Sequence, residues 1–451
     1  MRTFAVMKDK VKIYMLLICV LCTWSAAAQE QRDSANKSAA QEQRDSVSEV
    51  GDSIEISLLT CEPHDEAYSM YGHTALLVND IKKKFRYTVN YGVFDFDSSG
   101  FIWRFILGQT DYEMGMFLMT DFMSEYEKRG SGVIEQKLNL TPHERTMIYE
   151  AMRENYREEN RKYRYNFFYD NCTTRARNLV TDHLDGIVVW PEDSTETEQP
   201  TWREMVHRYN AGSPWLRFGI DLLLGWEADR PTTRTERQFL PFQLLNDFNH
   251  TMVERNDSTL TPLVGENRVI LENASGHTDT DAIVRGGDAS PLSGGPFTPF
   301  WCLTLLSVLI IAVTWWEWRS GKVLWGVDAL LMTVTGLVGL IPTVMLFSDH
   351  PTVSKNLQIL LFNPLPLLFL WPVVRSRRRG RCHLWWRLRA VLLVLFLIGA
   401  LWQHYAEGLI PLATALFVRC VMIGKKKKKN SNKAEDSKNM YRKREKVGKN
   451  V

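Results

Sequence analysis

A single cysteine, Cys172, lies where the sequence YDNCTTRARNLV (169–180) begins a helix. Asn171 before it is a favoured helix N-cap, and apolar residues after it recur at the spacing of one helix face. The first turn of a helix presents free N–H groups and a partial positive charge, and both stabilise a thiolate. The same N–H groups can stabilise the oxyanion that forms when a thiolate attacks a carbonyl carbon. The pattern therefore predicts Cys172 as a nucleophile.

A nucleophilic thiol needs a base, and His73 is the histidine that we expect to supply it. In the segment YGHTALLV it begins a strand, and Gly72 before it permits a close backbone approach. Asn90, on the next predicted strand, is the third group, which would orient the imidazole. Asp95 and Asp170 are the alternatives for that position.

Non-catalytic interpretations of these residues stay open. His73 is also consistent with a hydrogen-bonded core histidine. Cys172 and Cys61 are the only cysteines in the expected mature exported half, where oxidising conditions favour a disulfide. No ligand pair has metal-site spacing, and no carboxylate pair indicates a glycosidase. We therefore expect neither a metal nor a cofactor.

Strands and helices position these side chains in separate stretches of the chain. Strands are expected at 54–60, 74–78 and 84–91, and the last alternates apolar and polar residues. Thr141, Pro142 and Glu144 have the pattern of a capping box with proline at the first helical position, opening a helix to about 161. This segregation predicts an α+β fold.

The N-terminal residues 1–28 have the form of a signal peptide, with lysines, a short apolar run and a small-residue cleavage site. The apolar run is too short for a spanning helix, although an uncleaved anchor is the alternative. The polar segment AAQEQRDS occurs twice, at 27–34 and 39–46, and residues 29–53 are predicted to form a disordered linker. We assign the catalytic domain to 54–260. A tether rich in Gly, Ser, Thr and Asp follows at 261–297, with a candidate strand at 268–271.

Long apolar runs fill the C-terminal part of the chain, near 298–318, 323–347, 357–374, 390–406 and 408–424. Several approach the roughly twenty residues that a bilayer crossing needs, which predicts an all-α membrane domain of about five helices over 298–424, with four as the alternative. Arginine and lysine concentrate in the first and third connections and after the last run. The positive-inside rule then places the basic tail, 425–451, in the cytoplasm and the N-terminal half outside.

The distribution of charge also bears on partners. The net charge is only +3, and the soluble half has no extended basic patch. Positive charge gathers beside the apolar runs instead, where it acts on anionic lipid. We therefore expect the bilayer as a partner and exclude nucleic acid.

At these residues the sequence resembles a known family. The segments YGHTALLV, NYGVFDF, ENRKYRYNFFYDNCTTRARNLV and LLLGWEADRPTT are similar to the periplasmic domain of the Bacteroides-type lipoprotein N-acyltransferases, and the apolar runs resemble that family's membrane domain. That family is similar in layout to circularly permuted papain-like thiol enzymes, in which a strand histidine precedes the helix cysteine. The resemblance covers nearly everything after Ile54. It implies Cys172 as nucleophile, His73 as base and a location in the bacterial inner membrane.

The resemblance also implies an activity. The thiolate would attack a phospholipid ester and form an acyl-thioester, and the α-amine of a diacylglyceryl-cysteine on an apolipoprotein would then take the acyl chain. A membrane-anchored thiol hydrolase, either a peptidase or a cell-wall amidase, is the alternative enzyme. A non-catalytic scaffold with a Cys61–Cys172 disulfide is the third interpretation.

Three residues are candidates for substrate binding. Arg175 is a candidate for a phosphate headgroup, with a structural salt bridge as its alternative. Asn171 lies beside the thiol, and His350 lies in an outside-facing connection, where a simple turn is the alternative. Residues 101–123 are dense in Phe, Trp and Met, and we expect a core hairpin there, or a surface that cradles acyl chains or enters the membrane.

Overall fold

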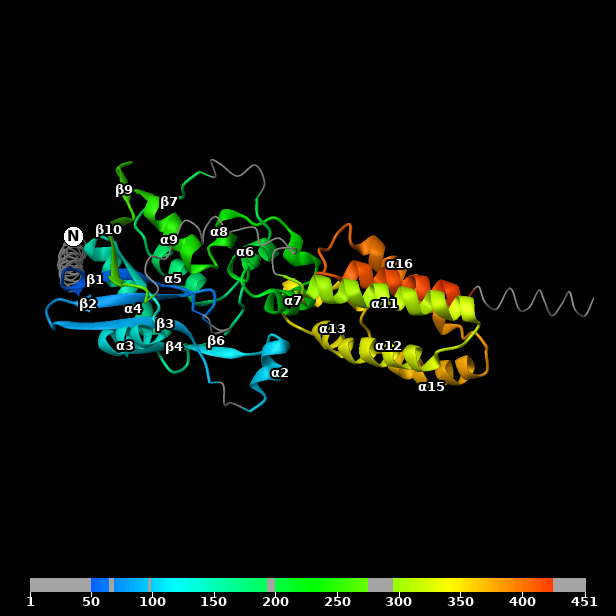
Figure 1. Cartoon of the computed structure of the whole chain (residues 1–451). Helices are drawn as coiled ribbons and strands as arrows, with labels where there is room; N and C mark the ends of the chain where they lie inside the picture. Colours follow the sequence, from blue (N-terminus) through cyan, green and yellow to red (C-terminus); the bar gives the residue numbers. More distant parts are fainter. Residues whose placement is uncertain (1–49, 65–68, 96–98, 193–198, 275–294, 425–451) are drawn as a thin grey trace, which may run out of the picture.

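The computed structural model describes residues 50–64, 69–95, 99–192, 199–274 and 295–424. The predicted signal peptide, nearly all of the linker and the basic tail lie outside these residues. The described chain has two parts, a half that contains the β-sheets and a bundle of helices beside it (Figure 1). The prediction of an α+β half followed by a helical one is confirmed.

The sheet-containing half has the following elements up to residue 181: β1 (Ile54–Cys61), β2 (His73–Asp80), β3 (Phe85–Val93), α2 (Phe101–Ile106), β4 (Asp111–Leu118), α3 (Met119–Arg129), β5 (Val133–Leu138), α4 (Pro142–Asn155), β6 (Lys162–Arg164) and α5 (Cys172–Thr181). It continues with β7 (Ile187–Val189), α6 (Trp202–Tyr209), α7 (Pro214–Leu223), η1 (Trp226–Asp229), α8 (Arg234–Arg237), α9 (Pro241–His250), β8 (Met252–Glu254), β9 (Leu260–Pro262) and β10 (Val264–Leu271). The three predicted strands are confirmed as β1, β2 and β3.

An antiparallel seven-stranded sheet with the order β10-β5-β1-β2-β3-β4-β6 forms the core of this half. Helices α4, α5 and α9 pack on one face and α3 packs on the other. Strand β1 is buried on both faces, because Ile56 and Leu58 belong to the cluster with α4, α5 and α9, whereas Leu59 and Cys61 belong to the cluster with α3. A sheet covered on both faces gives β2 and β3 fixed positions, and these strands carry His73 and Asn90.

The domain boundary predicted at residue 260 is corrected by the structure. β9 pairs with β8, and β10 pairs with β5 at the edge of the large sheet, so the sheet-containing half extends at least to Leu271. An edge strand is open to solvent, and most of β10 is exposed and polar. The sequence of β10 is therefore polar like that of a linker, which is why the tether was predicted to begin before it. The part of the predicted tether from 275 to 294 lies outside the described residues.

The helical half consists of α11 (Pro299–Ser320), α12 (Trp325–Val338), α13 (Leu340–Met345), α14 (Pro351–Ser354), η2 (Leu357–Leu360), α15 (Leu365–Arg378), α16 (Trp385–Gly399) and a last helix, Leu409–Gly424. Three segments of the described chain are long and apolar enough to cross a membrane, namely Pro299–Ser320, Trp325–Met345 and Pro351–Arg378. Together with α16 and the last helix they agree with the prediction of about five helices.

Four buried charged side chains join different helices of the bundle. Arg377 on α15 and Arg419 on the last helix both pair with Asp328 on α12, each across 2.7 Å, and both also pair with Glu317 on α11. Charges buried in an apolar bundle are stable only when they are paired in this way.

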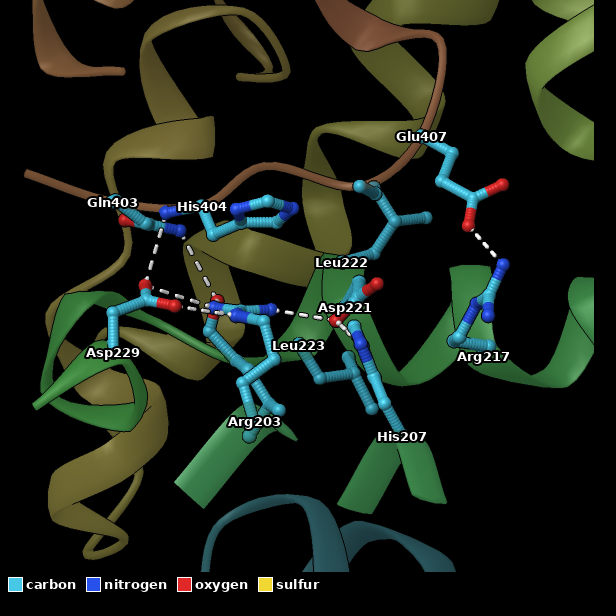
Figure 2. Close-up of polar contacts among 12 residues, drawn as sticks. Arg203, His207, Arg217, Asp221, Leu222, Leu223, Asp229, Gln403, His404 and Glu407 are labelled. Carbon is cyan, nitrogen blue, oxygen red and sulfur yellow. Dashed lines mark hydrogen bonds and ion pairs between the residues drawn. The ribbon is translucent and has the colours of Figure 1, made fainter. Parts of the chain in front are cut away.

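A polar joint connects the two halves (Figure 2). Arg203 on α6 donates to Asp221 and to Asp229, across 2.7 Å in each case, and His207 lies 2.9 Å from the same Asp221 oxygen. The helical half completes the joint, because the His404 backbone N–H donates to Asp229. We call this set the interdomain joint; it comprises Arg203, His207, Asp221, Asp229, Gln403 and His404.

Backbone contacts bring the halves together at the same place. The Gln403 side-chain amide donates to the Leu224 backbone carbonyl across 3.1 Å, and the Gly225 backbone N–H donates to the Thr352 carbonyl across 2.8 Å. A Cβ at Gly225 would lie 2.3 Å from the Lys355 carbonyl oxygen, so only glycine fits there. The sheet-containing half is thus held in one orientation on the membrane helices.

Candidate active site

Helix α5 begins with a reciprocal cap. The Asn171 side-chain oxygen Oδ1 accepts from the Thr173 and Thr174 backbone N–H groups at 3.0 and 2.9 Å, and the Thr174 hydroxyl accepts from the Asn171 backbone N–H. The predicted N-cap is therefore confirmed. The Asn171 amide nitrogen donates to the Phe167 and Phe239 carbonyls, so this buried side chain has no donor or acceptor left for a substrate.

The cap also changes one expectation about the oxyanion. The Thr173 and Thr174 N–H groups, which a helix N-terminus usually offers to an anion, are already bound to Asn171. They are not free to stabilise an oxyanion at the carbonyl that Cys172 attacks, so any further donor beside the Cys172 N–H must come from another part of the site.

The half-buried Cys172 is the first residue of α5, and its sulfur is hydrogen-bonded to His73. Burial, the largest single influence, raises the pKa of Cys172. The charge and hydrogen bond of His73, with hydrogen bonds from the Thr74 backbone and the Thr173 hydroxyl, outweigh burial and lower the pKa to about 7. A large fraction of Cys172 is therefore thiolate at neutral pH.

His73 is held between two partners. Its Nε2 lies 3.0 Å from the Asn90 carbonyl oxygen, and the Asn90 amide nitrogen donates to the Thr88 hydroxyl. That oxygen can only accept, so Nε2 carries the proton and Nδ1 is left for the thiol. Burial is the largest influence and lowers the pKa of His73, but attraction to Cys172 and the two hydrogen bonds raise it overall.

Gly72 sets the position of His73 at the start of β2. Its φ is +76°, and a Cβ there would lie 2.6 Å from the Cys61 carbonyl oxygen. Only glycine adopts this backbone without strain at such a close approach. The expectation of a close backbone approach at Gly72 is confirmed.

Cys61 is a buried free thiol, and Cys172 is also free. Cys61 lies directly opposite His73 in the β1–β2 pairing, and burial raises its pKa above its usual range. The structure therefore contains two thiols near His73, of which Cys172 is reactive and Cys61 is not. The two are not joined in a disulfide.

Two residues beside the thiol were missed by the sequence analysis. Gly92, with φ of +90°, lies between the thiol and a tyrosine, because a Cβ there would be in ordinary contact with both, 3.8 Å from Cys172 Cβ and 3.9 Å from the Tyr163 hydroxyl oxygen. That hydroxyl is buried and has no hydrogen-bond partner among the described residues. Burial first, and then the nearby Cys172, raise the pKa of Tyr163, so the phenol stays protonated and can donate. The segment KYRYNFF contains no pattern that separates this tyrosine from a core residue.

Comparison with known families agrees with this geometry. The model described as the Lnb N-terminal periplasmic domain matches residues 44–208, and the model described as the Lnb transmembrane domain matches residues 291–431. The chain belongs to the Lnb-type lipoprotein N-acyltransferase family. No curated protein and no solved structure matches the chain. Membership of the Lnb family makes this a membrane protein with a periplasmic domain and indicates an acyltransferase.

The other candidates in this Lnb-family chain have structural contacts. Arg175 pairs with Asp170 through two hydrogen bonds of 2.6 and 2.7 Å and lies 3.5 Å above the centre of the Tyr163 ring. It thereby positions Tyr163, and its contact with a lipid phosphate stays a prediction. The ring of His350 is hydrogen-bonded to the Phe105 backbone, so it joins the helical half to α2. In the part of the chain that the structure describes, no group of His, Cys, Asp or Glu side chains could hold a metal ion.

Alkylation should distinguish the two thiols and report the pKa of Cys172. We expect iodoacetamide to label Cys172, with a rate that rises through a midpoint near pH 7, and to leave Cys61 unmodified. In Asn90→Ala the midpoint should move upward, because His73 loses a bond that raises its pKa. In His73→Ala it should rise above about 8.5, the value of an ordinary thiol, because His73 no longer offsets the effect of burial. Peptide mass spectrometry measures each rate, and an unchanged midpoint in His73→Ala would contradict the ion pair.

Proposed function

We propose that this protein transfers an acyl chain from a phospholipid, through a thioester on Cys172, to the α-amine of the N-terminal diacylglyceryl-cysteine of apolipoproteins. The observation that carries the proposal is a low-pKa thiol paired with His73, in a periplasmic domain held on membrane helices. Both substrates present their reacting groups at the outer surface of the inner membrane, which suits such an arrangement. The basic tail would face the cytoplasm.

The first step forms the thioester. The Cys172 thiolate attacks the ester carbonyl of the phospholipid, and the bond to the glycerol oxygen breaks. The protonated His73 gives its proton to the departing oxygen, which leaves as the hydroxyl of a lysophospholipid. Asn90 keeps the imidazole in the required orientation and tautomer.

The second step forms the amide. The α-amine of the lipoprotein cysteine attacks the thioester, His73 takes a proton from the amine, and the C–S bond breaks to regenerate the thiolate. The products are an N-acylated lipoprotein and the free enzyme. Because the first product, the lysophospholipid, leaves before the second substrate reacts, ping-pong kinetics are expected.

Tyr163 is the group that we assign to the oxyanion in both steps. Its protonated hydroxyl, unpartnered among the described residues, is beside Gly92 and Cys172, and the Thr173 and Thr174 N–H groups of α5 are taken by Asn171. Tyr163→Phe should lower kcat by about 10²-fold with little change in KM. The midpoint for alkylation of Cys172 in this variant should stay near pH 7. A shifted midpoint with unchanged kcat would indicate a purely structural tyrosine.

The full-length protein in phospholipid vesicles tests the proposed function directly. With a deuterated acyl donor and no acceptor, we expect Cys172 to carry the deuterated acyl group as a hydroxylamine-labile adduct. Addition of a diacylated lipopeptide should move that group to the peptide amine, as mass spectrometry would show. Free fatty acid alone, or cleavage of a peptide or of cell-wall material, would overturn the proposal in favour of the thiol hydrolase.

A further inference from the structure

A short helix of the periplasmic domain presents large apolar side chains to the outside. Helix α2 connects β3 to β4 and lies at the end of this domain that faces the helical bundle (Figure 1). Trp103 is 63% exposed and Phe105 is 46% exposed. Two exposed aromatic rings on one helical turn form an apolar patch, and such a patch marks a site that contacts a protein, a ligand or a membrane.

The position of α2 indicates what that partner is. The Leu107 carbonyl accepts from the Asp349 N–H across 2.9 Å, and the ring of His350 is hydrogen-bonded to the Phe105 backbone. Asp349 and His350 lie between two membrane-crossing segments, and the adjoining Phe347 is 74% exposed. The contacts therefore hold α2 beside the connection between these two segments.

Near-parallel rings connect α2 with the thiol. Phe105 stacks on Phe101 at 6.2 Å between ring centres, Phe101 on Tyr112 at 6.5 Å, and Tyr112 on Tyr165 at 4.1 Å. A Cβ at Gly92 would lie 3.9 Å from Tyr112 and 3.8 Å from Cys172 Cβ, so Tyr112 lies close to the thiol. We call Phe105, Phe101, Tyr112 and Tyr165 the aromatic row.

We propose that α2 enters the outer leaflet of the membrane and that the aromatic row is the wall along which a phospholipid acyl chain reaches Cys172. Aromatic side chains suit this position, because they are stable at the boundary between lipid and water. Flat, stacked rings form an apolar surface that accepts a flexible chain without specific hydrogen bonds. The role of the aromatic row rests on the proposed acyl transfer, whereas insertion of α2 does not.

Photocrosslinking tests the insertion. The full-length protein, with p-benzoylphenylalanine in place of Trp103, is placed in vesicles of phosphatidylethanolamine and phosphatidylglycerol and irradiated. We expect lipid adducts at position 103. The matched control carries the same amino acid at Phe85, which is 45% exposed at the opposite end of β3 and should give no adduct. Equal adducts at both positions, or none at 103, would overturn the proposal.

Acylation tests the path. Trp103→Glu combined with Phe105→Glu should slow acylation of Cys172 by vesicle phospholipid at least about tenfold. The same variant should react with iodoacetamide as the unaltered protein does, which shows that the thiol is intact. Phe85→Glu should keep the original acylation rate. If the unaltered protein forms no acyl-Cys172 while position 103 still crosslinks to lipid, the proposed function fails but membrane insertion stands. An unchanged rate in the double variant would exclude the path.

Discussion

Replacement of Cys172 by alanine is expected to reduce acyl transfer at least about 10⁴-fold, because both proposed steps pass through its sulfur. In cells that have no other enzyme for this reaction, lipoproteins should then keep two acyl chains and a free α-amine. Mass spectrometry of lipoprotein N-terminal peptides measures this directly. The oxyanion donor and the membrane domain remain in the variant, but neither supplies a nucleophile.

Cys61→Ala is the matched control for this experiment. Cys61 is the other thiol near His73, but it is buried and its pKa is raised. We expect Cys61→Ala to keep its activity within a few-fold. Triacylated lipoproteins that persist in Cys172→Ala cells, or a loss of activity in Cys61→Ala protein that is still folded, would refute Cys172 as the nucleophile.

Arg203→Met is expected to cost about 3–5 kcal/mol of unfolding free energy, because it leaves two carboxylates of the interdomain joint without their cation. Asp221 is buried, and Arg203 donates to both it and Asp229. Methionine retains much of the volume of the arginine stem, so the loss reports the charge. Denaturant unfolding in detergent micelles measures it.

Two further variants make the cause clear. Arg153→Met removes a surface ion pair with Glu150, in which both side chains are more than half exposed, and should change stability by less than about 0.5 kcal/mol. Adding Asp221→Asn to Arg203→Met should recover part of the loss, because one of the unpaired charges disappears. Equal losses in Arg203→Met and Arg153→Met would mean that the joint does not stabilise the protein.

The sequence was sufficient for the parts of the site whose signals are local. The N-cap at Asn171 and the strand that begins at His73 depend on neighbouring residues, and both are as predicted. The pairing of β2 with β3 then brings Asn90 to His73, as the order of the strands suggested. Helix α5 ends at Thr181, before Leu184, the last apolar residue at the spacing of its buried face.

The parts that were missed depend on contacts between distant residues. Tyr163 stands out only because its hydroxyl is buried without a partner, which no spacing in the sequence reveals. The interdomain joint links Arg203 and Asp229 to Gln403 and His404, roughly two hundred positions away in the chain. Asn171 was misjudged as a substrate contact because its proximity to the thiol is visible in the sequence, whereas its bonds to Phe167 and Phe239 are not.

The edge position of β10 determines where this protein can be divided for study. A fragment that stops before Val264 would expose the backbone of β5, and an open strand of this kind invites aggregation. A fragment that continues through Leu271 keeps the large sheet complete. Even then, detachment from the helices would remove the donors that Leu224 and Asp229 require, so a water-soluble version needs compensating substitutions on that surface.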